Sequence, residues 1–375
     1  CNGTSTDWAD LTFANTAPET RNSVSISGGN ENVNYFVSGD IMDRQGVFAS
    51  GDLNFKQKQI RSNLDVKMTD DIKIGLDLSG RFAENNEPGV DAGFIYKHIY
   101  TNEPTEVGLY PNGLPGWGGE NGANPYVMSS NQSGFGKTTT NDLRARISLD
   151  WKLDKITEGL SFNGFVGLRR MNNNEKSWYT PWTIYRLDES SGDYNPEIGF
   201  SQSGQQRILR ESFWKFDETL INSTLRYNRT FDNHSINTFV GFEQQTSETS
   251  NFWAQKQDFP TPDHPYLFAG SSEGQISNGS ASEAALLSYF GSFAYDYNKK
   301  YFLELTVRRD GSSNFGPGNN FDTFYSVGGS WAIGKESFLE NVEWLDALNL
   351  RSSYAVMGND RIQPFQFLTR YSYGN

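Results

Sequence analysis

The sequence predicts an all-β protein, an antiparallel up-and-down meander of about twelve long strands. Three observations predict this fold. Apolar and polar residues alternate with a period of two through about twelve segments, and two is the repeat of a β-strand. Aromatic residues make up 14% of the chain and it contains 37 glycines, which is typical of strands joined by tight turns. Short and long connections also alternate along the chain.

Segment 144–153 illustrates the alternation. One side of this segment would carry the apolar residues Ala145, Ile147, Leu149, Trp151 and Leu153. The other side would carry Arg144, Arg146, Ser148, Asp150 and Lys152. The predicted strands lie near residues 22–27, 34–43, 55–68, 72–84, 140–153, 160–172, 213–227, 235–250, 285–297, 301–309, 324–333 and 348–357. Many reach the roughly 9–11 residues that a tilted strand needs to cross a bilayer.

The connections give a second pattern. The long ones are predicted at about residues 44–54, 85–139, 173–212, 251–283 and 310–323, and short ones separate them. Outer-membrane barrels have short turns on one side of the membrane and long loops on the other, so this order favours such a barrel. Segment 334–347 departs from the pattern, because it falls among the short connections yet is not short. A soluble β-rich carbohydrate-binding module also has one wet and one apolar strand face, and it stays the alternative.

Composition excludes several classes of protein. The net charge of −13 disfavours nucleic acid as a partner, because no basic stripe is available for phosphates. No stretch approaches the roughly 18–20 apolar residues of a membrane-spanning helix. Cys1 is the single cysteine, so a disulfide framework within this sequence is excluded. Since the sequence starts at Cys1 without a Met or a targeting segment, we interpret it as part of a longer chain, with an acylated lipoprotein terminus as the alternative.

Several short runs resemble a known family. Residues 6–10 read TDWAD, residues 23–29 read SVSISGG and residues 34–38 read NYFVS. Further along, residues 309–316 read RDGSSNFG and residues 350–359 read LRSSYAVMGN. In this order they resemble the plug-to-barrel junction and successive strands of the SusC/RagA family of TonB-dependent outer-membrane transporters. Each run is a weak signal, whereas the ordered set spans nearly the whole sequence.

The resemblance implies a fold and an organisation. It implies a barrel of about 22 strands in the cell outer membrane, closed by an N-terminal plug. Residues 1–20 would then form the end of the plug and its junction with the barrel, and residues 21–375 part of the transmembrane β-barrel with extracellular loops. The sheet would be open because the sequence is truncated, with about twelve of the strands present.

The resemblance also implies a function. The expected activity is TonB-dependent active import of a glycan or peptide nutrient, with this part supplying barrel wall and external loops. The expected partners are a SusD-like surface lipoprotein, outer-membrane lipid, and the TonB complex acting through an N-terminal region that this sequence lacks. No nucleic acid is expected to bind.

Neither catalysis nor a cofactor is expected from the motifs. His98, His234 and His264 are far apart in the sequence and are interpreted as solvated loop residues, so no catalytic or metal site is predicted. Aromatic residues in the long loops are the candidate substrate contacts, because flat rings stack on sugars and on peptide side chains. They are Trp117, Tyr126, Trp178, Trp182 and Trp253. The alternative is that these rings pack the loops against one another and against the lipoprotein.

Overall fold

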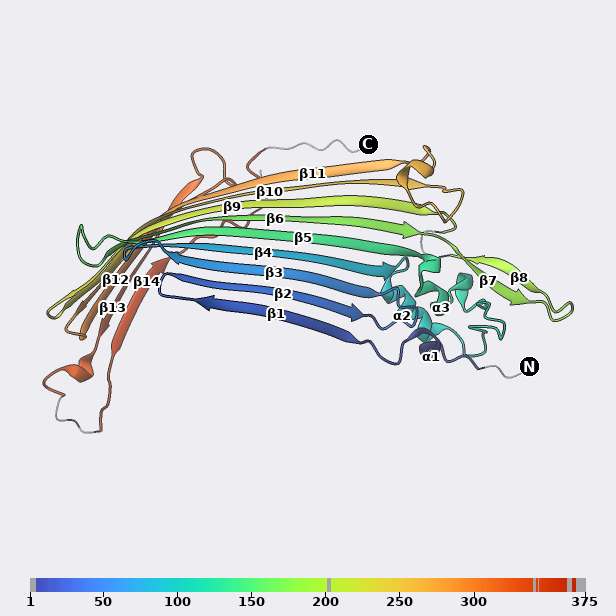
Figure 1. The fold of residues 1–375 in the computed structure, drawn as a ribbon, viewed down its shortest axis with the longest axis horizontal. Coiled ribbons are helices and arrows are strands. Elements are labelled where there is room, and N and C mark those ends of the chain that lie inside the picture. Colours follow the sequence, from blue (N-terminus) through green and yellow to red (C-terminus); the bar gives the residue numbers. More distant parts are fainter. Residues whose placement is uncertain (1–4, 201–203, 340–341, 343, 363–365, 369–375) are drawn as a thin grey trace.

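A computed structural model describes residues 5–200, 204–339, 342, 344–362 and 366–368. Within these ranges, twelve strands form one antiparallel sheet, and each strand lies beside its neighbour in sequence except where a small hairpin intervenes (Figure 1). The strands are β1 (Glu19–Gly29), β2 (Val33–Gln45), β3 (Asn54–Lys67), β4 (Ile72–Pro88), β5 (Gly134–Lys152), β6 (Leu160–Tyr179), β9 (Ile208–Phe231), β10 (His234–Gln257), β11 (Ile276–Tyr297), β12 (Tyr301–Ser312), β13 (Phe321–Trp331) and β14 (Leu350–Val356). The predicted all-β meander is confirmed.

The sheet is curved and open. The long strands lie side by side, and β12 to β14 turn away from the plane of β1 to β6 (Figure 1). In the part of the chain that the structure describes, β1 pairs only with β2 and β14 only with β13. Both outer strands therefore present free backbone groups on one side.

The two ends of the sheet differ. One end, here called the turn end, carries tight connections, such as Asp232 and Asn233 between β9 and β10. Asp232, Asn298 and Lys299 adopt positive φ angles of 50°, 54° and 54° in these turns, and Asp and Asn tolerate that left-handed conformation better than most residues. The other end, the loop end, carries connections 89–133, 180–207 and 258–275. The 332–349 connection lies at the turn end and is the exception that the sequence indicated.

Several strands continue further toward the loop end than the sequence pattern predicted. β9 and β10 are 24 residues long each, and their ladder pairs Gln257 with Ile208 at its far end. The sequence pattern assigned residues 173–179, 208–212 and 251–257 to loops. Polar residues interrupt the apolar alternation there, but the backbone ladder does not require apolar side chains to continue.

The long connections contain structure of their own, which the sequence did not predict. β7 (Trp182–Leu187) and β8 (Tyr194–Gly199) form a separate hairpin that projects beyond the loop end (Figure 1). The helices are α1 (Trp8–Thr12), α2 (Ala92–Thr101) and α3 (Pro125–Met128), with 3₁₀ turns η1 (Glu120–Gly122), η2 (Asn131–Ser133), η3 (Leu267–Ala269) and η4 (Ile333–Lys335). The Asp91 and Asn124 side chains cap α2 and α3 by accepting backbone N–H bonds. None of the helices in the described ranges is long and apolar enough to cross a membrane.

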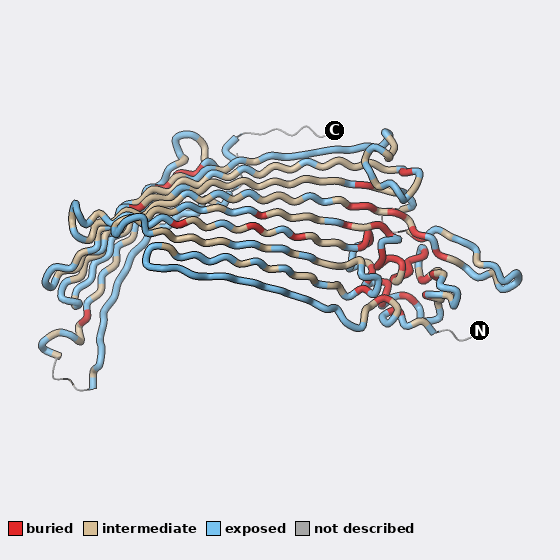
Figure 2. The backbone as a smooth tube through the Cα atoms, in the orientation of Figure 1, coloured by how far each residue is buried: buried red, intermediate tan, exposed pale blue. Residues whose placement is uncertain are grey.

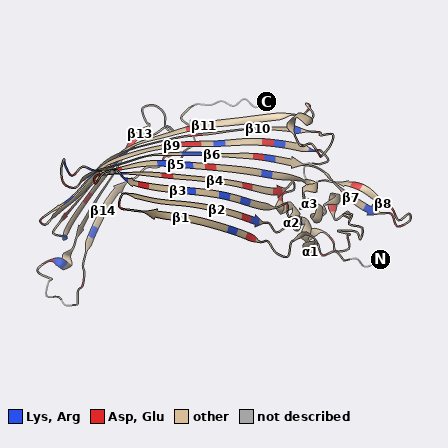
Figure 3. Ribbon diagram, viewed as in Figure 1, with Lys and Arg blue, Asp and Glu red and all other residues tan. Residues whose placement is uncertain are grey.

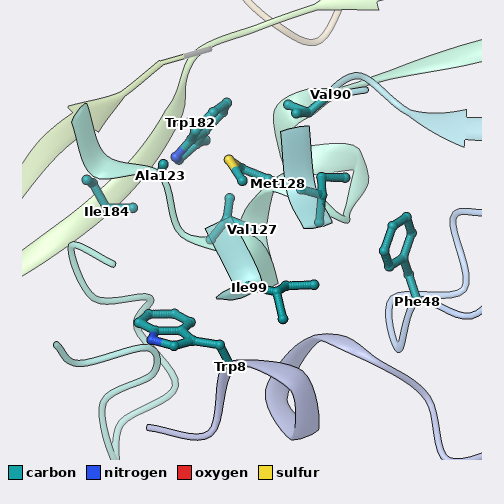
Figure 4. Packing of buried hydrophobic residues seen from close by; sticks show 10 residues of the cluster. Trp8, Phe48, Val90, Ile99, Ala123, Val127, Met128, Trp182 and Ile184 are labelled. Carbon is teal, nitrogen blue, oxygen red and sulfur yellow. The ribbon is translucent and has the colours of Figure 1, made fainter. Parts of the chain in front are cut away.

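Buried residues gather at the loop end rather than along the sheet (Figure 2). The loop-end cluster joins α1, α2, α3, β7 and the segments between them (Figure 4). Its members are at most 6% exposed, and they are Trp8, Phe48, Val90, Ile95, Ile99, Ala123, Val127, Met128, Trp182 and Ile184. The long sheet is thus a single layer whose side chains on both faces are largely exposed or half-buried.

Candidate functional site

The register of the sheet gathers apolar side chains on one face, here called the apolar face. Between 36% and 70% of each of these side chains is exposed. They include Val24, Ile26, Val37, Ile41, Ile60, Leu78, Leu143, Ile147, Val166, Leu168, Ile221, Leu225, Val240, Leu303, Leu305 and Val307. A continuous exposed apolar surface on this scale marks a membrane or protein contact, because isolated water-soluble proteins rarely expose one.

The apolar band has defined limits. Along β4 it extends from Ile72 to Phe82, ten steps of about 3.3 Å, which a strand tilt of about 40° reduces to a height of about 25 Å. Toward the loop end it stops at charged residues such as Lys58, Glu84 and Arg170. A band of this height matches the lipid-facing surface of a transmembrane β-barrel.

Aromatic rings line the band at the turn end. Tyr301 stacks between Tyr297, with ring centroids 6.3 Å apart, and Trp331, at 6.4 Å. The hydroxyl of Tyr301 and the indole N–H of Trp331 both donate to Glu336 Oε1, at 2.6 and 2.9 Å. An amphipathic ring with its polar tip at the edge of an apolar band is typical of the interfacial girdle of membrane proteins.

The opposite face, here called the polar face, carries charges of both signs. Lys73 pairs with Asp150 and Asp77 with Arg146, so the charged sets of β4 and β5 share this face. Figure 3 shows Lys and Arg interspersed with Asp and Glu along the strands. The sheet therefore separates an apolar from a charged surface, as a wall between lipid and a water-filled or plugged lumen does.

Two networks hold charges on the polar face. Asp142 accepts from both Arg144, at 2.9 Å, and Arg169, at 3.1 Å, and is only 4% exposed. Arg308 donates to Asp310 at 2.6 Å and to Ser288 at 2.8 Å. Each network links neighbouring strands, so these contacts fix side-chain positions on the polar face.

Beyond the height of the apolar band, the polar face of β9 and β10 becomes aromatic, and we call this area the upper wall. Arg210 lies 4.1 Å from the centroid of the Trp253 ring. Trp214 and Phe216 stack with centroids 6.2 Å apart and an interplanar angle of 5°. Asn173 pairs with Trp214 in the register, and its buried Oδ1 accepts no hydrogen bond in the described structure.

Small polar residues surround these rings. Glu175, Ser212, Asn251, Asn278 and Ser280 share the polar face with Trp214 and Trp253. Asn251 donates to Ser280 at 2.6 Å, and Ser212 to Glu175 at 3.4 Å. Flat rings beside short hydrogen-bonding side chains can both stack on a ligand and bind its polar groups, so the upper wall is the candidate binding surface.

The five aromatic candidates from the sequence lie in three places. Trp182 belongs to the loop-end cluster, and its Nε1 donates to the Gly122 carbonyl at 2.9 Å. Trp117, which lies 4.0 Å under the Arg186 guanidinium, and Tyr126 pack against the same cluster. Trp178 is 3% exposed and packs edge-to-face on Phe259.

Trp253 lies in β10 on the upper wall rather than in a loop. The buried Trp178 and Trp182 pack as the alternative interpretation expects, and substrate contact by any of the five stays a prediction. The sequence missed Arg210, Trp214 and Phe216, since both sides of segment 208–218 mix charged and aromatic residues. All three have even residue numbers, so a strand would place them on one face, and this was the one signal that the sequence offered.

His98 was interpreted as a solvated loop residue, and this is wrong. It is 4% exposed within α2, with Nδ1 3.1 Å from Asn102 Oδ1 and its ring 4.6 Å from that of Phe94. Burial lowers the pKa of His98, because desolvation disfavours the charged imidazolium. In the described ranges no group of three or more His, Cys, Asp or Glu side chains could hold a metal ion.

Comparison with known proteins supports this geometry. TonB-dependent receptor P3 of Formosa agariphila is 26% identical to the chain, in an alignment that covers 98% of this chain and 35% of the relative. TonB-dependent receptor SusC of Bacteroides thetaiotaomicron is 25% identical, over 99% of this chain and 36% of the relative. The chain thus spans about a third of the length of these curated relatives. No protein-family model matches the sequence.

The fold is shared with solved structures. The RagAB peptide importer in its open-open state superposes with a TM-score of 0.75 at 23% identity, covering 96% of this chain and 38% of that one. A second RagAB peptide transporter structure gives a TM-score of 0.72 at 22% identity. The meander with its apolar and charged faces therefore shares the fold of part of the barrel wall in these transporters. In sequence and in fold, the chain is similar to proteins of the SusC/RagA type.

Proposed function

We propose that the protein imports a nutrient across the outer membrane by TonB-dependent active transport, and that this chain forms part of the barrel wall and its external loops. The observation that carries the proposal is the division of one sheet into an exposed apolar band and a charged opposite face. A soluble carbohydrate-binding module would have to leave the apolar band in water. Receptors with related sequences, named for TonB dependence, support the transport function.

The proposal includes an orientation. The turn end would face the periplasm and the loop end the outside, because barrel receptors have short periplasmic turns and long external loops. Residues 1–20 would be the end of the plug and its junction. Thr6 Oγ1 donates to the Glu106 carbonyl at 2.7 Å and Trp8 Nε1 to the Glu103 carbonyl at 3.1 Å, which supports a junction held by the 89–133 connection.

The substrate would be a glycan or a peptide that passes the upper wall. Trp214 and Trp253 would stack on its rings or side chains, while Asn251 and Arg210 would bind its polar groups. The loop-end cluster would shape the external surface on which a SusD-like lipoprotein sits. Energy would come from the TonB complex, through a part of the protein outside this sequence. The chemistry would be non-covalent throughout, so the protein would be a transporter and not an enzyme.

Uptake by cells that carry the full-length protein tests this function. Deletion of the gene should abolish growth on one glycan or peptide mixture, and complementation should restore growth only when TonB is present. Trp214→Ala should weaken uptake, whereas Tyr297→Phe, at the turn end and on the other face, should not.

Membrane extraction distinguishes the alternative. The full-length protein should stay with the outer-membrane fraction after a high-salt wash and require detergent for release. Release by salt alone as a monodisperse glycan-binding protein would reject the importer and favour the soluble module.

A further inference from the structure

The apolar face contains a hollow of about 650 Å³ at the loop end of the band. It crosses β3 to β6 and reaches β9, and its apolar lining includes Ile60, Phe82 and Leu143. Its size falls within the roughly 300–1,000 Å³ range of small-molecule sites.

Small residues form the floor of this hollow. Gly80 pairs with Ile60 on one side and with Leu143 on the other, while Ser62 and Ala145 flank Leu78 in the next row. A Cβ atom at Gly80 would lie 3.3 Å from Leu143 Cδ2 and 3.3 Å from Phe82 Cε2. Leu143 and Phe82 therefore close tightly over Gly80, and a side chain added there would have to displace them and enter the hollow.

The rim toward the loop end is charged. Arg170 and Asp217 line it, joined by a 3.0 Å bond from Arg170 Nε to Asp217 Oδ1, and the Arg170 side chain is 69% exposed. Lys215 also contacts Asp217, at 2.7 Å, and comes within 3.9 Å of Glu248. Arg170 therefore keeps donors that Asp217 does not use.

A further cation lies nearby. Lys58 sits on β3 between Ile41 and Phe82 on the same face. Among the described residues, its side chain makes no ion pair or hydrogen bond. The hollow would therefore offer an apolar surface to an acyl chain, and the two cations at its loop-end rim would offer hydrogen-bond donors to a phosphate. A membrane lipid carries these two groups in the same order.

We propose that this hollow binds one acyl chain of an anionic, phosphate-bearing membrane lipid, with Arg170 and Lys58 contacting the phosphate. The inference rests on the proposed function, because it needs the apolar face to meet lipid. Asp217 uses only part of Arg170 and is also held by Lys215, so a phosphate can still contact the remaining Arg170 donors and Lys58. The apolar hollow needs no hydrogen-bonding partner, which favours an acyl chain over a protein segment. The site would order one lipid at a fixed position on the barrel wall.

Lipid retention by the full-length protein tests the proposal. The protein is placed in nanodiscs of phosphatidylglycerol or of phosphatidylcholine, and the lipids retained after transfer to detergent are counted by native mass spectrometry. We expect one phosphatidylglycerol to be retained about tenfold better than phosphatidylcholine, because the choline cation of phosphatidylcholine offsets the charge of its phosphate. Gly80→Leu and Arg170→Gln should each remove most of this preference.

Matched controls lie on the same face away from the hollow. Gly329→Leu adds the same side chain on β13, where the nearest atom to a new Cβ is 3.7 Å away, and Arg309→Gln removes a cation on β12. Neither should change retention. If Gly80→Leu fails to assemble, Ser62→Leu fills the same hollow from the neighbouring strand.

Three results would overturn the proposal. They are equal retention of both lipids, equal loss in the Gly329→Leu control, and competition by inorganic phosphate that removes the preference entirely. A protein that stays in the outer membrane but retains no lipid defeats only this inference. A protein released by salt alone defeats the proposed function as well.

Discussion

Replacing Trp182 by alanine would separate two roles that aromatic residues at the loop end can have, packing and ligand contact. The ring is 3% exposed, so its truncation removes about 200 Å² of buried surface, or about 5 kcal/mol at about 25 cal/mol per Å². Partial collapse of the cavity reduces the cost to about 3–5 kcal/mol. Trp182→Phe keeps most of the packing but leaves the Gly122 carbonyl without its indole donor, at about 1–3 kcal/mol.

Hydrogen exchange in the full-length protein measures this local cost. Amides of α3 should exchange about a hundredfold faster or more in Trp182→Ala, because α3 contributes Val127 and Met128 to the same cluster. Trp117→Ala serves as the control, since Trp117 is only half-buried beside the cluster and should change exchange less. Unchanged exchange in α3 together with weaker substrate binding would refute the packing argument and favour ligand contact by Trp182.

Three further predictions concern the two faces and the loop end. Ile147→Arg, on the apolar face, should cost about 2–4 kcal/mol of barrel stability in folding titrations from urea into lipid, while Ser148→Arg on the polar face should be tolerated; equal effects would contradict the assignment of the faces. Burial lowers the pKa of His98, so the folded state favours the neutral imidazole. The folded state should therefore keep its full stability above pH 6.5, the ordinary pKa of the group, and lose stability as the pH falls below that value. Limited proteolysis of the 89–133 connection should accelerate on acidification, and His98→Gln should remove this dependence. Trp214→Ala and Trp253→Ala should each lower substrate affinity about five- to tenfold in calorimetry without reducing the amount of protein in the outer membrane, and unchanged affinity in both would exclude the upper wall as the binding surface.

The strands of the sheet were predictable because their pattern is local. Leu303, Leu305 and Val307 alternate with Glu304 and Thr306, and this alternation needs only the strand geometry to place one set on each face. The alternation of short turns and long connections likewise needs no tertiary information.

The loop end could not be predicted in the same way, because its order comes from tertiary contacts. Trp182 and Ile184 begin a hairpin with little local signal, and they are buried by residues far away in sequence, such as Met128 and Trp8. His98 is buried for the same reason. No period-two or helical pattern in one sequence shows which loops meet one another.

The pairing order of the sheet also bears on how the barrel assembles. Nearly every strand pairs with the strand before and after it, so hairpins can be added one at a time with little loss of chain entropy. Two strand pairings should form more slowly, because the connections that they close, residues 89–133 and 180–207, are long. Compared with the turn at 30–32, the first is nearly four doublings longer and costs about 2 kcal/mol more chain entropy, at about 0.6 kcal/mol per doubling. We therefore expect assembly to pause at β4 and at β6, where the folded loop-end cluster would bring the next strand back to the growing edge.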